Sequence, residues 1–271
     1  EVGWAAGDAG TVLHTFNAGL SWVEMQTEAY QDLRDVYFAD GLSGAAVGEG
    51  GTVLLTADGG QQWTRLYGDT YYTLRGVALE NVLHIIAVGN NGTISVTNNG
   101  QDFERLDDLA EITIRNLTDI SMPDGFHAWV VGDQGTVLRS SDGGYTWEKL
   151  DCPTSLNLNG VLFKDNENGW ICGDNGTVLS TSNGGNDWND ISGSSPAWIR
   201  AIDFTGTTSG WAVGDEGAIW RTSDGGQEWL RSDSPTQAAL WDVAAVDEQH
   251  AWAVGVSDFG GGRIIATTNG E

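Results

Sequence analysis

The stretch VVGDQGTVLRSSDGGYTW, residues 130–147, decides the fold because it is one copy of a repeat. In this copy a glycine ends a short apolar run, Asp-x-Gly follows, and an Asp-Gly-Gly turn leads to a tryptophan. The unit occurs seven times, at spacings of 41, 41, 43, 41, 41 and 41 residues. We take the first glycine of each copy as its anchor: Gly7, Gly48, Gly89, Gly132, Gly173, Gly214 and Gly255.

One repeat predicts a blade of four antiparallel strands. In the second copy, LRDVYF (33–38) reads as strand A, GAAVG (44–48) as a buried strand B, TVLLTA (52–57) as strand C and QQWTRL (61–66) as strand D. A period of this length, built from short strands, is typical of propeller blades. We therefore predict an all-β fold, a seven-bladed β-propeller of four-stranded antiparallel blades, with residues 1–271 as a single domain.

The first and last repeats are incomplete. The first begins at strand B, and the last stops at TTNGE, before its strand D, so the chain supplies six A, seven B, seven C and six D strands. Either the outer strands of the closing blades are lost, or the chain is part of a longer polypeptide. We expect the second, because an unclosed ring leaves exposed strand edges that propellers normally protect.

Residues that recur in nearly every copy are expected to shape blades rather than to bind a ligand. Asp133 and its equivalents follow the anchor, where they can hold the B–C hairpin. Asp142 and its equivalents lie in the C–D turn, and Trp147 and its equivalents follow that turn. Turn residues of this kind hydrogen-bond their own backbone, so their recurrence requires no ligand.

These residues resemble a known family. SSDGGYTW (140–147), TADGGQQW (56–63) and TSDGGQEW (222–229) are similar to the Asp-box of bacterial neuraminidase repeats. The longer unit GWAVGDEGAIWRTSDGGQEW (210–229), preceded by IRAIDF (199–204), resembles the photosystem II assembly and stability factor family. The resemblance covers essentially the whole chain and implies a seven-bladed propeller; for function it is less specific, because one fold serves many functions.

Composition narrows the class of partner. The net charge is −26 with 12 Lys and Arg, which disfavours nucleic acid as a partner. No apolar run is long enough to cross a bilayer, so we expect no direct membrane insertion. Cys172 stands where other copies have valine, so it is expected to be a buried small apolar residue, and neither it nor Cys152 requires a disulfide.

No metal, cofactor or catalytic site is predicted. His84, His127 and His250 each lie five residues before an anchor, on three different blades, so they do not converge as zinc ligands must. Sialidases that carry Asp-boxes also use three converging arginines and a tyrosine nucleophile, and the motifs around such a set are missing here. We therefore predict that the chain is not an enzyme.

The informative residues are those that break the repeat. Fourteen residues before the anchors, at the start of strand A, stand Arg34, Arg75, Thr118, Asn159, Arg200 and Trp241. Strand A is usually innermost, so these side chains should ring one mouth of the central channel, and the family resemblance implies an arginine patch on such a face. Alternatively, Arg34 pairs with Glu49 and Arg200 with Asp215 across the A–B hairpin, leaving Arg75, opposite Asn90, as the freer cation.

Aromatic residues gather in the same connections. Tyr30, Tyr71, Tyr72 and Trp198 precede the arginines, and Phe259 lies in an enlarged B–C turn of the last repeat. Exposed Trp, Tyr and Arg together are typical of protein-interface hot spots, although some of these rings could simply cover the channel mouth. The candidate partner-binding residues are Arg34, Arg75, Arg200, Trp198, Trp241, Asn159, Tyr71, Tyr72 and Phe259.

The sequence therefore favours a non-enzymatic propeller that binds another protein or a larger assembly. The main hypothesis is a structural or attachment module on an extracellular or virion surface. One alternative is a photosystem II assembly factor that binds an unassembled reaction-centre subunit, in a thylakoid lumen or periplasm. The other is a lectin-like propeller that binds a glycan on Trp198 and Trp241.

Overall fold

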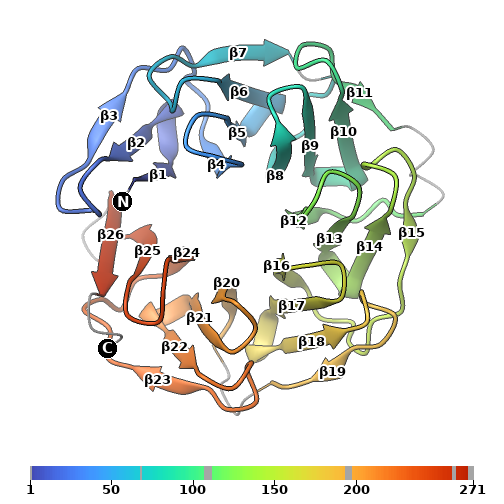
Figure 1. Cartoon of the computed structure of the whole chain (residues 1–271), viewed down its shortest axis with the longest axis vertical. Helices are drawn as coiled ribbons and strands as arrows, with labels where there is room; N and C mark the ends of the chain where they lie inside the picture. The colour runs from blue at the N-terminus through green and yellow to red at the C-terminus, as the bar shows by residue number, and fades with distance from the viewer. Residues whose placement is uncertain (1, 68, 107–111, 193–196, 258–260, 268–271) are drawn as a thin grey trace. The chain divides into compact units, whose positions relative to one another are not determined.

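The chain forms a seven-bladed β-propeller of small antiparallel sheets, as predicted. The computed structural model describes residues 2–67, 69–106, 112–192, 197–257 and 261–267. In these residues five sheets have four strands, and the first and last sheets have three (Figure 1). Among the described residues, the first sheet (β1-β2-β3) has no strand A, and the last sheet (β24-β25-β26) has no strand D.

The strands of each blade follow the chain in order from A to D. Blades 1 and 2 contain β1 (Gly3–Ala6), β2 (Val12–Thr15) and β3 (Val23–Met25), then β4 (Leu33–Phe38), β5 (Gly44–Gly48), β6 (Thr52–Thr56) and β7 (Thr64–Tyr67). Blades 3 and 4 contain β8 (Leu74–Asn81), β9 (His84–Gly89), β10 (Thr93–Thr97) and β11 (Glu104–Arg105), then β12 (Leu117–Ser121), β13 (Ala128–Gly132), β14 (Thr136–Ser140) and β15 (Glu148–Lys149). Blade 5 contains β16 (Leu158–Phe163), β17 (Asn168–Gly173), β18 (Val178–Ser182) and β19 (Asn189–Asp190). Blade 6 contains β20 (Ile199–Thr205), β21 (Ser209–Gly214), β22 (Ile219–Thr222) and β23 (Leu230–Ser232). Blade 7 contains β24 (Leu240–Ala245), β25 (Ala251–Val256) and β26 (Gly262–Thr267).

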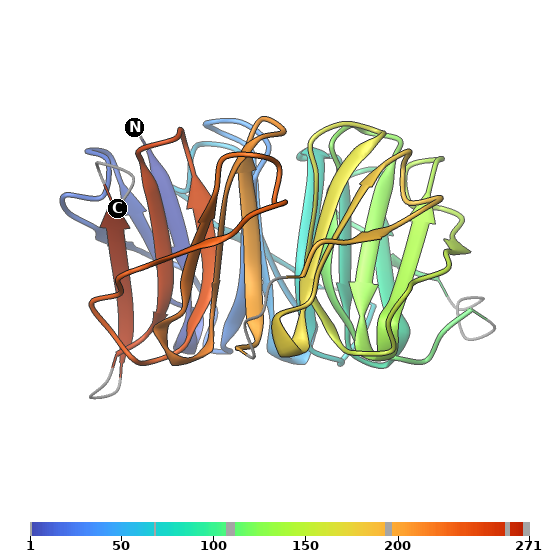
Figure 2. The same cartoon turned by 90° about the horizontal axis from the view of Figure 1, so that it is seen from below.

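The chain divides into two compact units. The first comprises residues 1–132 and 138–149, and the second comprises residues 133–137 and 150–271. Blades 1 to 3 and most of blade 4 belong to the first unit, and blades 5 to 7 belong to the second. Within each unit the strands run between two sets of turns, one at either end of the blades (Figure 2). Among the described residues, no helix is both long and apolar enough to cross a membrane.

Strands A and B of the second blade have the predicted bounds, but strand D does not. The prediction placed it at residues 61–66, whereas β7 begins at Thr64. The backbone N–H of Gln62 donates to Asp58 Oδ1 at 2.9 Å, so residues up to Gln62 belong to the C–D turn. Trp63 consequently precedes the strand and is 7% exposed.

The core lies between neighbouring blades and is centred on strand B. All five residues of β5 are buried, as are those of β13. Ala45 and Val47 of β5 pack with Leu74 and Val77 of β8, the next strand A in the chain. Cys172 is fully buried in β17, as its valine-like position predicts, and among the described residues it forms no disulfide.

In blades 2 to 7 the anchor glycine is required by space rather than by its backbone angles, whereas a Cβ atom at Gly7 would meet nothing within 4 Å. Gly48 has φ −171°, which any residue can adopt, but a Cβ atom there would lie 2.1 Å from the carbonyl oxygen of Asp32. The N–H of the next residue, Glu49, donates to the same carbonyl at 2.9 Å. The equivalent contacts recur at Gly89, Gly173 and Gly214, so the B–C turn of a blade is built directly against the start of its strand A.

The C–D turns are closed by the Asp-box, which confirms its structural role. Asp142 Oδ1 accepts the N–H groups of Tyr145 and Thr146 at 3.1 and 2.9 Å. Ser140 Oγ donates to the same carboxylate oxygen and accepts the N–H of Gly144 at 2.9 Å. The ring N–H of Trp147 donates to the Gly144 carbonyl, so the tryptophan is held by the turn that precedes it.

Replacing the Asp-box carboxylate should lower stability. Asp142→Ala removes the acceptor of two backbone N–H groups, and the expected loss is on the order of 1 kcal/mol in the free energy of unfolding, measured by urea denaturation. Asp142→Asn is the matched control, because Asn183 makes the equivalent backbone contact in blade 5. An alanine variant as stable as the asparagine variant would contradict this role.

Asp35 is a partly buried carboxyl that links two blades. Its Oδ2 atom accepts the N–H of Val77 in β8 at 2.8 Å. Part of the side chain is still accessible, but the carboxyl lies deep among protein atoms, and this desolvation raises its pKa to about 6. The hydrogen bonds from Val77 and Val36 act in the opposite direction and do not compensate for it.

This raised pKa predicts a pH-dependent stability. Because the folded state holds the Asp35 proton more tightly than the unfolded state does, the contribution of this group is fully present below about pH 4 and is lost as the pH rises through about 6. Asp35→Asn removes the titration. The difference in unfolding free energy between wild type and variant should therefore fall by roughly 2 kcal/mol between pH 4 and pH 7. A difference that is constant across this range would show that Asp35 is ionised at its ordinary pKa.

Candidate partner-binding site

The predicted strand A positions coincide with a β-bulge. In all six A strands the register with strand B skips one residue, and the skipped residues are Arg34, Arg75, Thr118, Asn159, Arg200 and Trp241. A bulged residue leaves the alternation of the strand, which re-aims its side chain. Buried Leu33, Leu74, Leu117, Leu158, Ile199 and Leu240 immediately precede the bulges. In four blades the bulged side chain contacts the first residue of the B–C turn while its neighbour stays in the core, as seen for Arg34, Arg75, Asn159 and Arg200.

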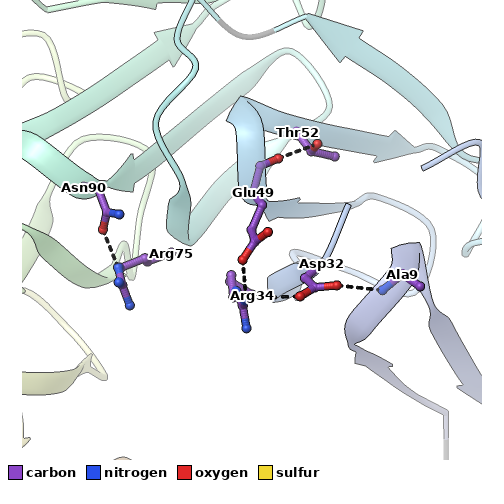
Figure 3. Close-up of polar contacts among 7 residues, drawn as sticks. All are labelled: Ala9, Asp32, Arg34, Glu49, Thr52, Arg75 and Asn90. Carbon is purple, nitrogen blue, oxygen red and sulfur yellow. Dashed lines mark hydrogen bonds and ion pairs between the residues drawn. The ribbon is translucent and has the colours of Figure 1, made fainter. Parts of the chain in front are cut away.

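In the first unit, Arg34 lies between two carboxylates. Its Nη2 atom donates to Glu49, the first residue of the B–C turn, and to Asp32 Oδ2 at 3.3 Å (Figure 3). Asp32 Oδ1 also accepts the N–H of Ala9 in the B–C turn of blade 1 at 2.9 Å. The predicted cross-strand pair is therefore confirmed, and the charge of Arg34 is balanced within the fold.

Arg75 occupies the same position in the next blade without a carboxylate partner. Its Nε atom donates to Asn90 Oδ1 at 2.6 Å, and the side chain is exposed (Figure 3). Among the described residues no ion pair to Arg75 occurs. The two terminal nitrogens of its guanidinium are consequently available for a carboxylate or carbonyl of a partner, as expected for the freer cation.

In the second unit, Arg200 lies between two tryptophans and a carboxylate. Its Nε and Nη2 atoms donate to the two oxygens of Asp215 at 2.9 and 3.0 Å, which is a bidentate pair. Its guanidinium carbon lies 5.2 Å from the Trp198 ring centre and 4.8 Å from the Trp241 ring centre. The rings are nevertheless 43% and 48% exposed, so this cluster presents rigid aromatic surface to solvent.

Trp198 replaces a residue that elsewhere joins neighbouring blades. At the equivalent position, Asp32, Asn116 and Asn157 each accept a backbone N–H from the B–C turn of the preceding blade, at 2.9, 3.0 and 3.1 Å. Tryptophan cannot accept such a bond. Ala239, at the same position in blade 7, has no side-chain acceptor either.

Asn159 has a structural explanation. Its amide nitrogen donates to Asp174 Oδ1 at 3.2 Å and to the carbonyl of Ile199 in the next strand A at 2.8 Å. The side chain therefore bridges two blades, and it is only partly exposed.

The tyrosines lie in the connections that lead into strand A. Tyr71 is 96% exposed, Tyr30 is 85% exposed, and Tyr72 is 42% exposed with the Arg105 guanidinium 5.4 Å from its ring centre. Arg105 is thus a second cation beside the connection that leads to Arg75, and the sequence interpretation missed it. It does not lie at the repeat position fourteen residues before an anchor, so that position gave no signal for it. Phe259 lies outside the described residues.

The expected grouping is seen only within each unit. Tyr71, Tyr72 and Arg75 come from one connection and its strand in the first unit, and Trp198, Arg200 and Trp241 are in contact in the second. That the two groups project from a single mouth of the molecule stays a prediction. The bulge itself had a detectable signal, because Arg34-Asp35, Thr118-Asp119 and Trp241-Asp242 break the apolar–polar alternation of strand A.

The three repeated histidines have separate partners. His127 Nδ1 and His250 Nδ1 each lie 2.9 Å from a carboxylate oxygen, of Asp124 and Asp247, and His84 Nε2 lies 2.9 Å from the carbonyl of Gly143. In the part of the chain that the structure describes, no three His, Cys, Asp or Glu side chains are grouped to hold a metal ion.

Stability should accordingly be independent of metal. Dialysis against a chelator is expected to leave the melting temperature unchanged, because carboxylates distributed over separate turns do not form the oxygen cage that Ca²⁺ requires. Differential scanning calorimetry before and after dialysis checks this, and a melting temperature that falls and is restored by added Ca²⁺ would show that the repeated carboxylates had been misinterpreted.

The blade architecture, the Asp-box turns and the bulged A strands define an Asp-box propeller. Residues 104–231, somewhat less than half of the chain, match the family model of the photosynthesis system II assembly factor YCF48. YCF48 from Cyanidioschyzon merolae aligns with a TM-score of 0.76 and 21% identity, over 98% of this chain and 91% of that one. A structure of YCF48 bound to D1 peptide aligns with a TM-score of 0.72 and 18% identity, over 98% and 84% of the two chains.

Other solved propellers have the same fold. The family 74 glycoside hydrolase xyloglucanase from Xanthomonas campestris aligns with a TM-score of 0.80 and 13% identity, over 100% of this chain and 50% of that one. A search of curated proteins found no match. The resemblance to the photosystem II assembly factor family is thus confirmed, whereas the identities to the solved structures are low enough that they show the fold alone. The absence of enzymatic activity stays a prediction.

Proposed function

We propose that this chain is a photosystem II assembly factor-like propeller that binds a segment of an unassembled reaction-centre subunit. The family-model match supports it, and so does the fold that the chain shares with the YCF48 bound to D1 peptide. This was the alternative at the outset. The comparisons favour it over a structural or attachment module on an extracellular or virion surface, which they do not support. The corresponding location is the thylakoid lumen.

The observation that carries the proposed site is the variation at the bulge. The backbone there is the same in every A strand, while the side chain changes from a carboxylate-paired Arg34 to an exposed Arg75 and an exposed Trp241. Loops and irregular positions on a rigid scaffold are where binding residues concentrate. We assign partner contact to Arg34, Arg75, Arg200, Trp198, Trp241, Tyr71, Tyr72 and Phe259, with Asn159 supporting the frame between them.

The two groups have different roles in this proposal. Arg75, with its free guanidinium nitrogens and the exposed rings of Tyr71 and Tyr72, binds a carboxylate or a row of carbonyls. The Trp198–Arg200–Trp241 cluster offers flat apolar faces whose orientation is fixed by Asp215, so it binds an apolar or aromatic side chain with little loss of side-chain entropy. The lectin-like alternative rests on the same two tryptophans, and no other feature of the described residues favours a glycan.

Substitutions in each group should weaken binding without unfolding the protein. Arg75→Ala and Trp241→Ala are each expected to lower the affinity for a photosystem II subunit peptide about 30-fold, equivalent to roughly 2 kcal/mol, as for interface hot spots. Isothermal titration calorimetry with peptides that tile the D1 subunit measures this, and the melting temperature verifies the fold.

Arg139→Ala is the matched control for charge. Arg139 lies on strand C and pairs with Glu148 at 2.7 Å, away from the bulges. An equal loss in this control would indicate general electrostatics, and unchanged binding in both Arg75→Ala and Trp241→Ala would place the interface elsewhere. Arg200→Ala is a weaker test, because it also leaves Asp215 without its bidentate partner.

A further inference from the structure

The A–B and C–D turns of blades 2 to 4 form a second surface in the first unit. Strands β4, β8 and β12 pack in succession and run in the same direction. Near their starts Gly76 lies against Asp119, where a Cβ atom would be 3.1 Å from the Asp119 Cα, and near their ends Gly125 lies against the Glu80 carboxylate. The A–B turns that follow these strands therefore emerge at one edge, at the end of the blades opposite to the bulges.

The C–D turns are fixed to the A–B turns by backbone hydrogen bonds. The N–H groups of Gly59, Gly100 and Gly143 donate to the carbonyls of Leu42, Leu83 and Phe126, at 2.9, 3.1 and 2.8 Å. His84 Nε2 in blade 3 also lies 2.9 Å from the Gly143 carbonyl in blade 4, so neighbouring blades are joined here too. We call these six turns, residues 39–43, 57–62, 80–84, 98–103, 122–127 and 141–146, the turn surface.

Three apolar side chains project from the turn surface at the same repeat position. Leu42, Leu83 and Phe126, each six residues before an anchor, are 59%, 54% and 66% exposed. In the second unit the same position holds Glu167, Thr208 and Gln249. Gly184 and Gly225 make the same backbone hydrogen bonds there to Glu167 and Thr208, at 3.0 and 2.8 Å. The turn therefore does not need an apolar residue, and the apolar triplet requires another explanation.

The charge around the triplet is predominantly negative. The turn surface carries two histidines, His84 and His127, beside Glu80 and Asp124, and no Lys or Arg. Its six carboxylates are those of Asp40, Asp58, Glu80, Asp102, Asp124 and Asp142. Backbone hydrogen bonds from Ser43 and Leu42 lower the pKa of Asp40, and the bond from Gln62 lowers that of Asp58, so both are ionised at neutral pH. Exposed apolar groups among fixed negative charges complement a cationic, amphipathic partner and repel anionic lipid.

A shallow pocket lies at the edge of this surface, between the C–D turns of blades 3 and 4. Its lining is mixed: it includes the apolar residues Val96 and Leu106, the ring of Tyr145, the polar residues Thr97 and Asn98, and the acidic residues Asp102 and Glu104. A Lys or Arg side chain has an apolar stem and a cationic head, so it matches a pocket lined by both apolar and acidic residues.

We propose that the turn surface docks a protein segment in which apolar and basic residues alternate on one side, with a basic side chain entering the pocket of Asp102, Glu104 and Tyr145. The triplet of Leu42, Leu83 and Phe126 supplies the apolar contact. This goes beyond the proposed function in two respects. The turn surface lies at the end of the blades opposite to the bulges, and its partner is basic, whereas the group that Arg75 binds is a carboxylate or a row of carbonyls.

The test is direct binding of a designed probe. A fluorescent amphipathic peptide of leucine and lysine is titrated with the full chain at about 0.15 M salt, where exposed charges are partly screened, and fluorescence anisotropy gives the affinity. Leu42→Ser/Leu83→Ser/Phe126→Ser should weaken binding at least about 10-fold, and Glu104→Gln at least about 3-fold. All four side chains are exposed, so the melting temperature should change little.

Thr208→Ser/Gln249→Ser, at the equivalent positions of the second unit, is the matched control and should bind as wild type does. A serine–lysine peptide of equal charge should bind more weakly than the leucine–lysine peptide. The proposal is overturned if the leucine–lysine peptide does not bind, if the triple variant binds it as tightly as wild type, or if both peptides bind equally. Binding to vesicles of anionic phospholipid in preference to the peptide would equally overturn it.

Discussion

In blades 2 to 7 the close contact between the anchor glycine and the carbonyl at the start of strand A is the constraint on which the rest of the blade depends. A Cβ atom at Gly214 would lie 2.0 Å from the carbonyl oxygen of Trp198, and one at Gly89 would lie 2.2 Å from that of Thr73. The same carbonyl accepts the N–H of the first residue of the B–C turn, which holds the start of strand A against the end of strand B. The bulge lies two residues further along strand A, and it fixes which side chain leaves the core.

This constraint separates the residues that hold the fold from those that are free to vary. The residue before the bulge is buried in every A strand, and the carbonyl before that residue is held by the turn, so both are occupied by the frame. The bulged side chain is not needed by the core, and the chain accepts Arg, Thr, Asn and Trp there. Blade-to-blade contact is supplied elsewhere, by strand B packing and by groups such as Asp35, so variation at the bulge need not weaken it.

The sequence was sufficient for the architecture because the same local rules recur seven times. Bounds of 33–38 and 44–48 were predictable from alternation and from a small apolar run, and the pairing of Arg200 with Asp215 followed from the hairpin register. Strand D was misplaced because the Asp58 turn extends to Gln62, which is a matter of side-chain hydrogen bonding rather than of hydrophobic pattern. The stacking of Arg200 between Trp198 and Trp241 depends on contacts between residues of two blades, for which a period within one blade contains no information.

The two ends of the blades differ in how they tolerate apolar residues, and this difference bears on function. At the bulge end, exposed rings are oriented by a cation and its carboxylate, as with Trp241 and Arg200, so their surface is pre-organised. At the turn end, the backbone is closed by Asp-box oxygens and by carbonyl bonds that are independent of the side chain six residues before the anchor. An exposed phenylalanine at such a position, as at Phe126, contributes nothing to a turn that Thr208 closes equally well. In the proposed docking, burial of this ring by a partner removes apolar surface from water, which favours binding.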